Sequence, residues 1–200
     1  MGIDSVKNRI RVVLSAEADA ISAIPITDAI YDAVDLMSHC NGKIIISGMG
    51  KAGIMARKMA ATLSSTGTPS IFLHPGEAQH GDLGIISPDD ILFVMSTSGK
   101  TREVIEMVKL SQNLYETKIK VISITSHLNS NLRSISDVIL DLGIIAEPCP
   151  LGLTPSASTT AMLALCDAIA IAIMDEKGIT KHDYAKRHHG GYLGAKARIK

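Results

Sequence analysis

Apolar residues follow two patterns along the chain, and together these patterns predict alternating helices and strands. A helical period predicts amphipathic helices over residues 5–24 and 27–40, which Pro25 separates. Short continuous apolar runs, of the kind that parallel sheets bury on both faces, predict strands over residues 43–47, 70–74, 91–95, 120–125 and 137–142. The stretches that follow the first, third and fifth of these strands predict helices over residues 52–65, 102–112 and 154–177.

The order of these elements predicts the fold class. Strands alternate with helices and no hairpin signal joins two strands, so each connection is expected to be a right-handed crossover. We therefore predict an α/β fold, a three-layer doubly wound sandwich with a five-stranded parallel sheet, formed as one domain by residues 1–200. Such sheets bind ligands beyond the carboxyl ends of their strands, so the loops after the strands are the candidates for function.

The composition of the chain narrows the classes of molecule that the protein could bind. The 20 basic and 20 acidic side chains balance, which argues against a protein that binds nucleic acid or an anionic membrane surface. The apolar stretch over residues 161–174 is too short to span a bilayer comfortably and contains Asp167, so we expect a buried helix instead. Three cysteines without a CxxC pair are typical of the reducing cytoplasm and oppose a structural zinc site.

The loop after the first predicted strand has the sequence SGMGKAG. Gly48, Gly50 and Gly53 match the GxGxxG pattern of dinucleotide-binding folds, but no acidic residue ends the next strand to bind a ribose. Tight packing of the strand against the helix would by itself explain the glycines. We favour a turn that presents Lys51 and backbone amides to a small anionic substrate.

The loop after the third predicted strand, STSGKT, places four hydroxyls at the start of a helix. Glycine is missing five positions before Gly99, so the loop is not a Walker A motif. One hydroxyl, from Ser98 or Thr101, would suffice to cap the helix. Four hydroxyls favour phosphate binding at the free amides and positive end of the helix. The candidates are Ser96, Thr97, Ser98 and Thr101.

Histidines occur in pairs in two other segments. His74 and His80 flank Glu77 just after the second predicted strand; this pair is weak evidence for a metal, and we expect these residues to line a polar site. His188 and His189 lie in a basic tail, which is either an exposed face or a contact with an anion or a neighbouring subunit.

Glu147 is the only carboxylate in the apolar, proline-containing segment ahead of the long helix. Desolvation there is expected to raise its pKa toward the range that suits a general base. The alternative is an ordinary acidic residue near the start of a helix.

Five ordered segments resemble one protein family. They are SGMGKAG, FLHPGEAQHGDLG, STSGKTREV, EPCPLGLTPSASTTAMLALCDAIA and RHHGGYLG, within a resemblance that runs from about Ser5 to Lys196. The chain is similar to the sugar isomerase (SIS) domain of bacterial arabinose-5-phosphate isomerases. The resemblance implies interconversion of D-ribulose 5-phosphate and D-arabinose 5-phosphate, which supplies the Kdo sugar of lipopolysaccharide or capsule. It also implies a cytoplasmic homo-oligomer, a tetramer, that requires no cofactor.

The resemblance also implies roles for single residues. The positions that match catalytically important residues of the family are Lys51, Glu103, Glu147 and His188. Those that match its substrate contacts are Gly67, Thr68, His74 and His80, to which we add Ser47 and Gly48 from the first loop. His74 also falls on a site where zinc is associated with the family, as an inhibitor.

Three features of the chain depart from the family pattern. Many members carry a pair of CBS modules after the isomerase domain, and we expect a form without them, because the chain ends at Lys200. Lys100 stands in a loop that is commonly SGES and is expected to add a cation beside the phosphate. His189 replaces a proline, which leaves open whether His188 or His189 enters the site.

The implied chemistry suits these residue types. Aldose–ketose isomerisation moves a proton between C1 and C2 through an enediol(ate), which requires a base and donors for the developing oxyanion. Glu147 is our first candidate for the base and Glu103 the second. Lys51 would stabilise the oxyanion or orient the hydroxyls of the sugar. His188 would move protons between oxygens or open the sugar ring, and its distance from the other motifs in the sequence suggests that it comes from a neighbouring subunit.

Three alternative functions stay open at this point. A regulatory module that only binds a sugar phosphate would need the hydroxyl loop but no base, so the joint presence of Lys51, Glu103, Glu147 and His188 favours an enzyme. An isomerase of another phosphosugar would use similar parts. A nicotinamide-dependent oxidoreductase is disfavoured by the missing ribose-binding acid.

Overall fold

The predicted five-stranded parallel sheet is present in the structure, a computed structural model that describes residues 2–198. The strands lie in the order β2-β1-β3-β4-β5, and all neighbours are parallel. Their bounds are β1 (Ile44–Gly48), β2 (Ser70–Phe72), β3 (Ile91–Met95), β4 (Lys120–Thr125) and β5 (Val138–Asp141). In the register, Ile44 of β1 lies opposite both Ser70 and Ile91.

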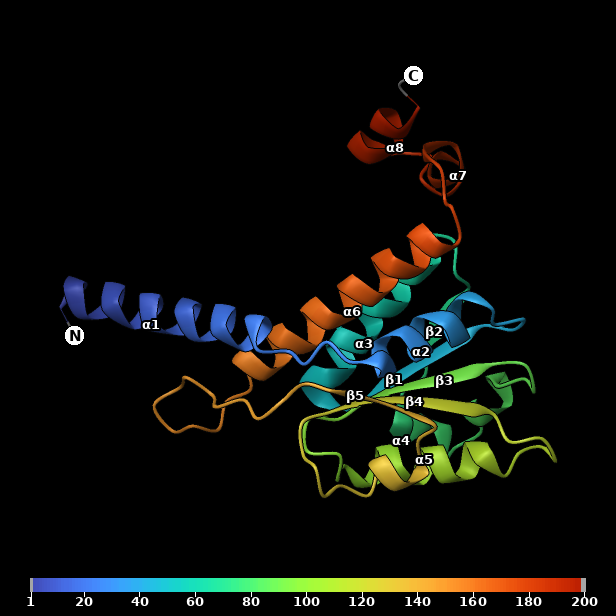
Figure 1. Ribbon diagram of the computed structural model, residues 1–200, viewed down its shortest axis with the longest axis horizontal. Coiled ribbons are helices and arrows are strands. Elements are labelled where there is room, and N and C mark those ends of the chain that lie inside the picture. The colour runs from blue at the N-terminus through green and yellow to red at the C-terminus, as the bar shows by residue number, and fades with distance from the viewer. Residues whose placement is uncertain (1, 199–200) are drawn as a thin grey trace.

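Helices cover both faces of this sheet, which confirms the three-layer arrangement (Figure 1). One face carries α2 (Asp28–Ser38), α3 (Gly50–Ser65) and α6 (Ala157–Glu176), and the other carries α4 (Pro75–Ala78) and α5 (Arg102–Gln112). α1 (Ile3–Ser22) packs against α6 and extends past the sheet. Two short 3-10 helices are η1 (Asp82–Ile85) and η2 (Arg133–Ile135), and the chain continues into α7 (Lys181–Arg187) and α8 (Gly191–Ala197).

The sequences of β1, β3 and β4 are largely apolar because each of these three strands contributes side chains to two hydrophobic cores. Successive strand residues point to opposite faces of the sheet, so Ile44 and Ile46 lie in the core beneath α3 and α6, whereas Ile45 lies in the core beneath α5. Phe93 fills the first core and Leu92 the second. Burial on both faces therefore explains why the sequence showed no alternation of polar and apolar residues.

α6 is the one helix among residues 2–198 that is long and apolar enough to cross a membrane by length and composition alone. Half of its apolar window is buried inside the fold, where the helix packs against α1, α2 and α3. Asp167, near the middle of α6, forms an ion pair with Lys58 of α3. The helix is therefore packed as the core element that the sequence predicted.

Most elements differ from the predicted ranges by a few residues at their ends, and two differences bear on the site. α6 begins at Ala157 and not at 154, because the segment before it is a loop whose acidic residue binds the first amides of the helix. The basic tail forms α7 and α8, which lie beyond the C-terminal end of α6 (Figure 1). Thr180 and Asp183 make a reciprocal capping box at the start of α7, and this T-x-x-D pattern is a sequence signal for the helix.

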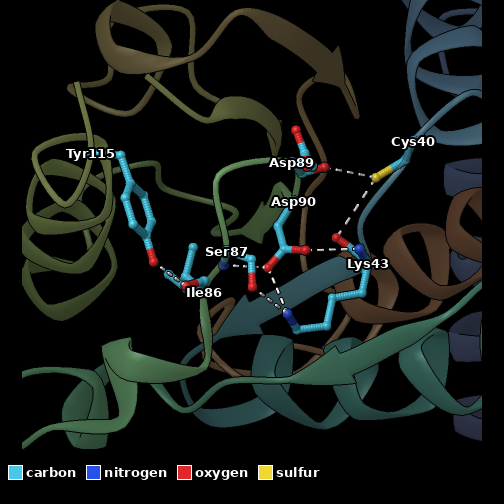
Figure 2. Close-up of polar contacts among 7 residues, drawn as sticks. All are labelled: Cys40, Lys43, Ile86, Ser87, Asp89, Asp90 and Tyr115. Atoms are coloured by element: carbon cyan, nitrogen blue, oxygen red, sulfur yellow. Dashed lines mark hydrogen bonds and ion pairs between the residues drawn. The ribbon is translucent and has the colours of Figure 1, made fainter. Parts of the chain in front are cut away.

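The amino-terminal edge of the sheet is closed by a buried carboxylate (Figure 2). Asp90, only 3% exposed, accepts hydrogen bonds from the Lys43 amide at 2.8 Å, Lys43 Nζ at 2.7 Å and the Ser87 amide at 2.7 Å. A side chain at Gly42 would approach Asp90 and lie 2.7 Å from the Asp89 backbone. These contacts tie the entries of β1 and β3 together.

Candidate functional site

A pocket of about 300 Å³ opens at the carboxyl ends of β1 and β3. These two strands are neighbours in the order β2-β1-β3-β4-β5. The connections that leave them run to opposite sides, and open α/β sheets bind ligands at such a point. We call this cavity the switch-point pocket. Its lining residues are Met49, Lys51, Ala52, Met95, Ser96, Thr97, Ser98, Thr101, Pro155 and Thr159.

The glycine-rich loop after β1 brings Lys51 to this pocket. Gly50 has a φ of 60°, which a residue with a side chain rarely adopts. A Cβ at Gly53 would lie 2.5 Å from the Gly48 carbonyl oxygen, so α3 can pack against the end of β1 only through glycine. Tight packing thus accounts for the glycines, and the same turn leaves Lys51 exposed on the pocket wall.

The hydroxyl loop after β3 forms the opposite wall. Ser96 Oγ lies 2.8 Å from Thr101 Oγ1 and accepts a hydrogen bond from the Gly99 amide at 3.1 Å. Ser98 Oγ accepts one from the Lys100 amide at 3.2 Å. Thr101 is the N-cap residue of α5, yet its side chain makes no capping hydrogen bond. The loop is therefore braced internally, while the α5 N-terminus keeps the free amides that favour an anion.

Glu147 lies beside the pocket, at the start of α6. Its Oε2 accepts hydrogen bonds from the Ser156 amide at 2.8 Å, Ser156 Oγ at 3.2 Å and the Ala157 amide at 3.0 Å. Its Oε1 accepts only one, from the Ser158 amide at 3.3 Å. Pro155 and Thr159, which bracket these donors in the chain, line the pocket.

The prediction of a raised pKa for Glu147 is wrong. Burial does raise the pKa, but the hydrogen bonds from Ser158 and Ser156 outweigh burial and hold it below the ordinary value of a glutamate. The alternative, an acidic residue that caps a helix, describes what this carboxylate does in the fold.

The carboxylate of Glu103, unlike that of Glu147, has no hydrogen-bond partner among residues 2–198. Glu103 lies in the first turn of α5, directly after the hydroxyl loop, and is half-buried. Within residues 2–198, its carboxylate makes no hydrogen bond or ion pair, whereas Glu106, one turn later, binds Arg102 and Gln79. Of the two predicted bases, Glu103 is the one whose oxygens are not already bound.

Three of the predicted site residues lie at the other end of α6. Gly67 has a φ of 98° and lies against the Arg187 side chain, and Thr68 Oγ1 accepts a hydrogen bond from Lys177 Nζ at 3.2 Å. His188 stacks on Tyr184 with ring centroids 3.8 Å apart. The 20 residues of α6 span about 30 Å, so one chain does not bring these groups to Lys51.

Of the paired tail histidines, His188 is half-buried and His189 is exposed. The His188 Nδ1 atom lies 3.1 Å from the Tyr184 carbonyl oxygen. The His188 ring is therefore held in place at the end of α7, whereas the His189 ring makes no hydrogen bond to any residue from 2 to 198.

The remaining candidates follow β1 and β2. Ser47 is fully buried, and its Oγ donates to the Leu73 carbonyl oxygen at 2.6 Å, so this hydroxyl is bonded inside the fold. His74 lines a separate cavity of about 600 Å³ along β2, together with Arg57 and Glu77. His80 is exposed just after α4.

These positions give no complete metal site within the part of the chain that the structure describes. There, no three His, Cys, Asp or Glu side chains gather closely enough to hold one ion. The Nδ1 atom of His74 is buried without a hydrogen-bond partner, so His74 offers a single donor. The association of His74 with zinc stays a prediction.

The sequence did not predict Thr159 as part of the switch-point pocket, and the predicted position of the Lys100 side chain is wrong. Thr159 lines the switch-point pocket, and the hydroxyl-rich segment SASTT at the start of α6 is the signal that could have identified it. Lys100, expected beside the phosphate, lines a neighbouring pocket instead, because its side chain leaves the hydroxyl loop on the other side.

Comparisons with known proteins agree with the fold and identify the family. The model of the SIS domain family matches residues 36–172. The chain is 44% identical over 168 residues to the arabinose 5-phosphate isomerase KdsD of Escherichia coli O157:H7, covering 84% of this chain and 50% of that protein. It is 41% identical over 189 residues to the KdsD of Pseudomonas aeruginosa, covering 94% and 57%. The chain thus spans about half the length of the curated relatives it matches.

Two solved phosphosugar-related structures match this chain over nearly their whole length. A Bacteroides fragilis protein assigned as a phosphosugar isomerase involved in capsule formation has 47% identity and a TM-score of 0.88, with 95% of this chain and 98% of that chain covered. The c3406 protein of Escherichia coli CFT073, in complex with arabinose 5-phosphate, has 34% identity and a TM-score of 0.88, with 94% and 100% covered.

Proposed function

Because the chain belongs to the SIS domain family, we propose that it is an aldose–ketose isomerase that interconverts D-ribulose 5-phosphate and D-arabinose 5-phosphate. The observation that carries the proposal is the switch-point pocket, which brings the Lys51 cation, the hydroxyl loop and the Glu147-capped end of α6 around one cavity. Relatives that are named arabinose 5-phosphate isomerase support this choice of substrate.

Binding would begin at the phosphate. Ser96, Ser98 and Thr101 offer hydroxyls, and α5 offers uncapped amides and the positive end of its dipole. These groups would anchor the end of the sugar that does not react, so that C1 and C2 lie toward Lys51.

The proton transfer needs a base with a free lone pair. Glu147 Oε2 already accepts three hydrogen bonds and Oε1 only one, so Oε1 is the atom that would take the C1 proton of the ketose. The electron pair left behind forms the enediolate, whose O2 oxygen Lys51 stabilises. The hydroxyl proton of O1 then passes to O2, the transfer predicted for His188, and the carbon proton returns to C2 to give the aldose. No atom is gained or lost, so the reaction requires no redox cofactor.

Glu103 is the competing base, since its carboxylate is unbound and adjoins the hydroxyl loop. Substituting each glutamate by glutamine separates the two. The base variant should lose about 10²–10⁴-fold in turnover together with exchange of the substrate carbon-bound proton with solvent deuterium. The other variant should keep that exchange; if both keep it, neither carboxylate is the base.

A second subunit would complete the site. His188, Gly67 and Thr68 are grouped at the far end of α6 from Lys51, so in this proposal they serve the pocket of a neighbouring copy. We accordingly propose a cytoplasmic homo-oligomer, a tetramer by resemblance to the family, whose product supplies Kdo synthesis. His188→Gln mixed with Lys51→Gln should regain part of the activity that each variant lacks, because mixed oligomers contain some pockets with both native residues.

One observation favours a second candidate, a module that binds a sugar phosphate without converting it. The lowered pKa of Glu147 and its place as a helix cap are what a structural carboxylate would show. Incubation with D-ribulose 5-phosphate, followed by NMR of the products, decides between the two functions. Formation of D-arabinose 5-phosphate supports the isomerase, and saturable binding without any product supports the module.

A further inference from the structure

A second pocket, of about 430 Å³, lies at the carboxyl ends of β4 and β5, beside the switch-point pocket. Thr97 lines both cavities, so the hydroxyl loop is the wall between them. We call this cavity the β4–β5 pocket. Its other lining residues are Lys100, Ser126, His127, Leu128, Asn129, Ile144 and Ile145.

The walls of the β4–β5 pocket are joined to one another. Arg133 Nε donates to the His127 carbonyl oxygen at 2.8 Å, and the same guanidinium pairs with Asp141. Asp141 Oδ1 in turn accepts from the Gly143 amide at 2.8 Å. The loop after β4 and the loop after β5 are therefore held in place through one ion pair, as in a preformed ligand site.

The charge of this pocket is positive. Lys100 lines it, and no Asp or Glu does. Asp141, the acidic residue that ends β5, is neutralised by Arg133. Lys100 makes no ion pair with any residue from 2 to 198. An anion is thus the ligand that this cavity would attract.

A buried hydroxyl in the same pocket has no hydrogen-bond partner. Ser126 is 5% exposed and lines the cavity, and its Oγ makes no hydrogen bond within the part of the chain that the structure describes. Buried polar atoms are nearly always bonded in folded proteins, and an orphaned one calls for a partner. Ser126 and the neighbouring Asn129 would supply hydrogen bonds that orient an anionic group.

The rim of the pocket is apolar. Leu128 is 71% exposed and Ile144 is 93% exposed, both at its lining. Aliphatic side chains of this exposure favour a ligand with a carbon skeleton over a bare inorganic ion. The volume falls in the range of small-molecule sites, about 300–1,000 Å³.

We propose that the β4–β5 pocket binds a small organic anion, through a phosphate or carboxylate group held by Lys100 and Ser126. The site is separate from the switch-point pocket and does not depend on the isomerase proposal, which uses none of its residues apart from the shared Thr97. The shared wall places its ligand against the loop that would hold the substrate phosphate.

The test follows the His127 side chain by NMR in the full chain while inorganic phosphate or, in a parallel titration, succinate is added. A saturable shift of the His127 signals is expected with at least one of the two anions. Lys100→Gln should weaken that binding about tenfold, because it removes a charged partner. Lys109→Gln, the matched loss of an exposed lysine on α5, should leave it unchanged.

A second pair of variants separates the two pockets. Ser126→Ala should also weaken the His127 response, whereas Ser98→Ala, in the switch-point pocket, should leave it in place. Response to phosphate alone identifies a phosphate ligand, and response to succinate alone identifies a carboxylate ligand. The proposal is overturned if neither anion moves the His127 signals, or if Lys100→Gln and Lys109→Gln affect them equally.

Discussion

The two edges of the same sheet use polar groups in opposite ways. At the amino-terminal edge, Asp90 is buried and both of its carboxylate oxygens are bonded to Lys43 or Ser87 (Figure 2). At the carboxyl edge, Lys51 is exposed on a pocket, and the α5 amides have no side-chain cap. β1 and β3 contribute to both edges. Polar groups that are satisfied within the chain stabilise the fold, and those left unsatisfied are available to a ligand.

The largest expected effect is the loss of the amino-terminal clamp. Asp90→Ala leaves the Lys43 ammonium and two backbone amides without their acceptor, which should lower the free energy of unfolding by about 3–5 kcal/mol. Urea unfolding followed by circular dichroism measures the change. Asp89→Ala is the matched control, since its side chain is exposed, and it should cost less than about 0.5 kcal/mol. Equal losses in both variants would contradict a specific role for Asp90.

The cysteines at the two edges should differ in reactivity. Hydrogen bonds from the Thr154 and Leu153 amides lower the pKa of Cys149, near the carboxyl edge, to about 7. Burial raises the pKa of Cys40, at the amino edge, and of Cys166, in the core. Because the thiolate is the nucleophile, iodoacetamide at pH 7 should alkylate Cys149 at least about tenfold faster than Cys40. Mass spectrometry of peptides gives the rates, and equal rates would show that the amides do not activate Cys149.

A smaller effect is expected from the helix cap at the carboxyl edge. Glu147→Gln removes the negative charge from the α6 N-terminus and should cost about 1 kcal/mol of stability at neutral pH. The folded-state pKa is depressed, so this stabilisation is fully present above the unfolded pKa of about 4.3. It is lost as the pH falls through the lower folded value.

The measurement is urea unfolding of the native chain and of Glu147→Gln across this pH range. The difference between them should stay constant between about pH 5 and 8 and shrink below about pH 4. Glu103→Gln, whose carboxylate is unbound within residues 2–198, is the control and should change stability by about 0.5 kcal/mol or less. A constant difference at every pH would contradict the charged cap.

The smallest expected effect on stability is at Lys51. Its ammonium makes no ion pair within the described residues, so Lys51→Met should change the free energy of unfolding by less than about 0.5 kcal/mol. The same variant should lose about 10²–10³-fold in turnover of D-ribulose 5-phosphate, because it removes the cation that would stabilise the enediolate oxygen; a coupled assay of product formation measures the loss. A large loss of stability would place Lys51 among the structural residues and would erase the contrast between the two edges.

The sheet and its main helices were predictable because their signals are local. β1 and β3 are continuous apolar runs buried on both faces, and the glycines of the first loop mark the turn into α3. The hydroxyl loop was recognisable for the same reason, since its side chains are consecutive. α7 was missed although Thr180 and Asp183 carry its start signal, because the surrounding basic residues indicated only an exposed tail.

What could not be predicted depends on groups distant in sequence or on the direction of single side chains. The pKa of Glu147 is lowered by amides nine to eleven residues away. Its apolar neighbours in the sequence had predicted a raised pKa, which is the wrong direction. Lys100 adjoins the phosphate loop in sequence but lines the β4–β5 pocket. Figure 1 shows α7 beyond the C-terminal end of α6. His188 follows α7, so it is separated from Lys51 by about the length of α6, which only the three-dimensional arrangement reveals.

The ion pair between Lys58 and Asp167 also bears on whether α6 could insert into a membrane. α6 has the length and apolarity of a membrane anchor, so a nascent chain that exposes it is a potential substrate for the membrane-insertion machinery. A carboxylate near the middle of such a segment disfavours insertion by about 2.5–3.5 kcal/mol. Lys58 is synthesised more than 100 residues earlier and is ready to pair when Asp167 emerges. The same carboxylate that pairs α6 with α3 thus also disfavours the insertion of this helix into a bilayer.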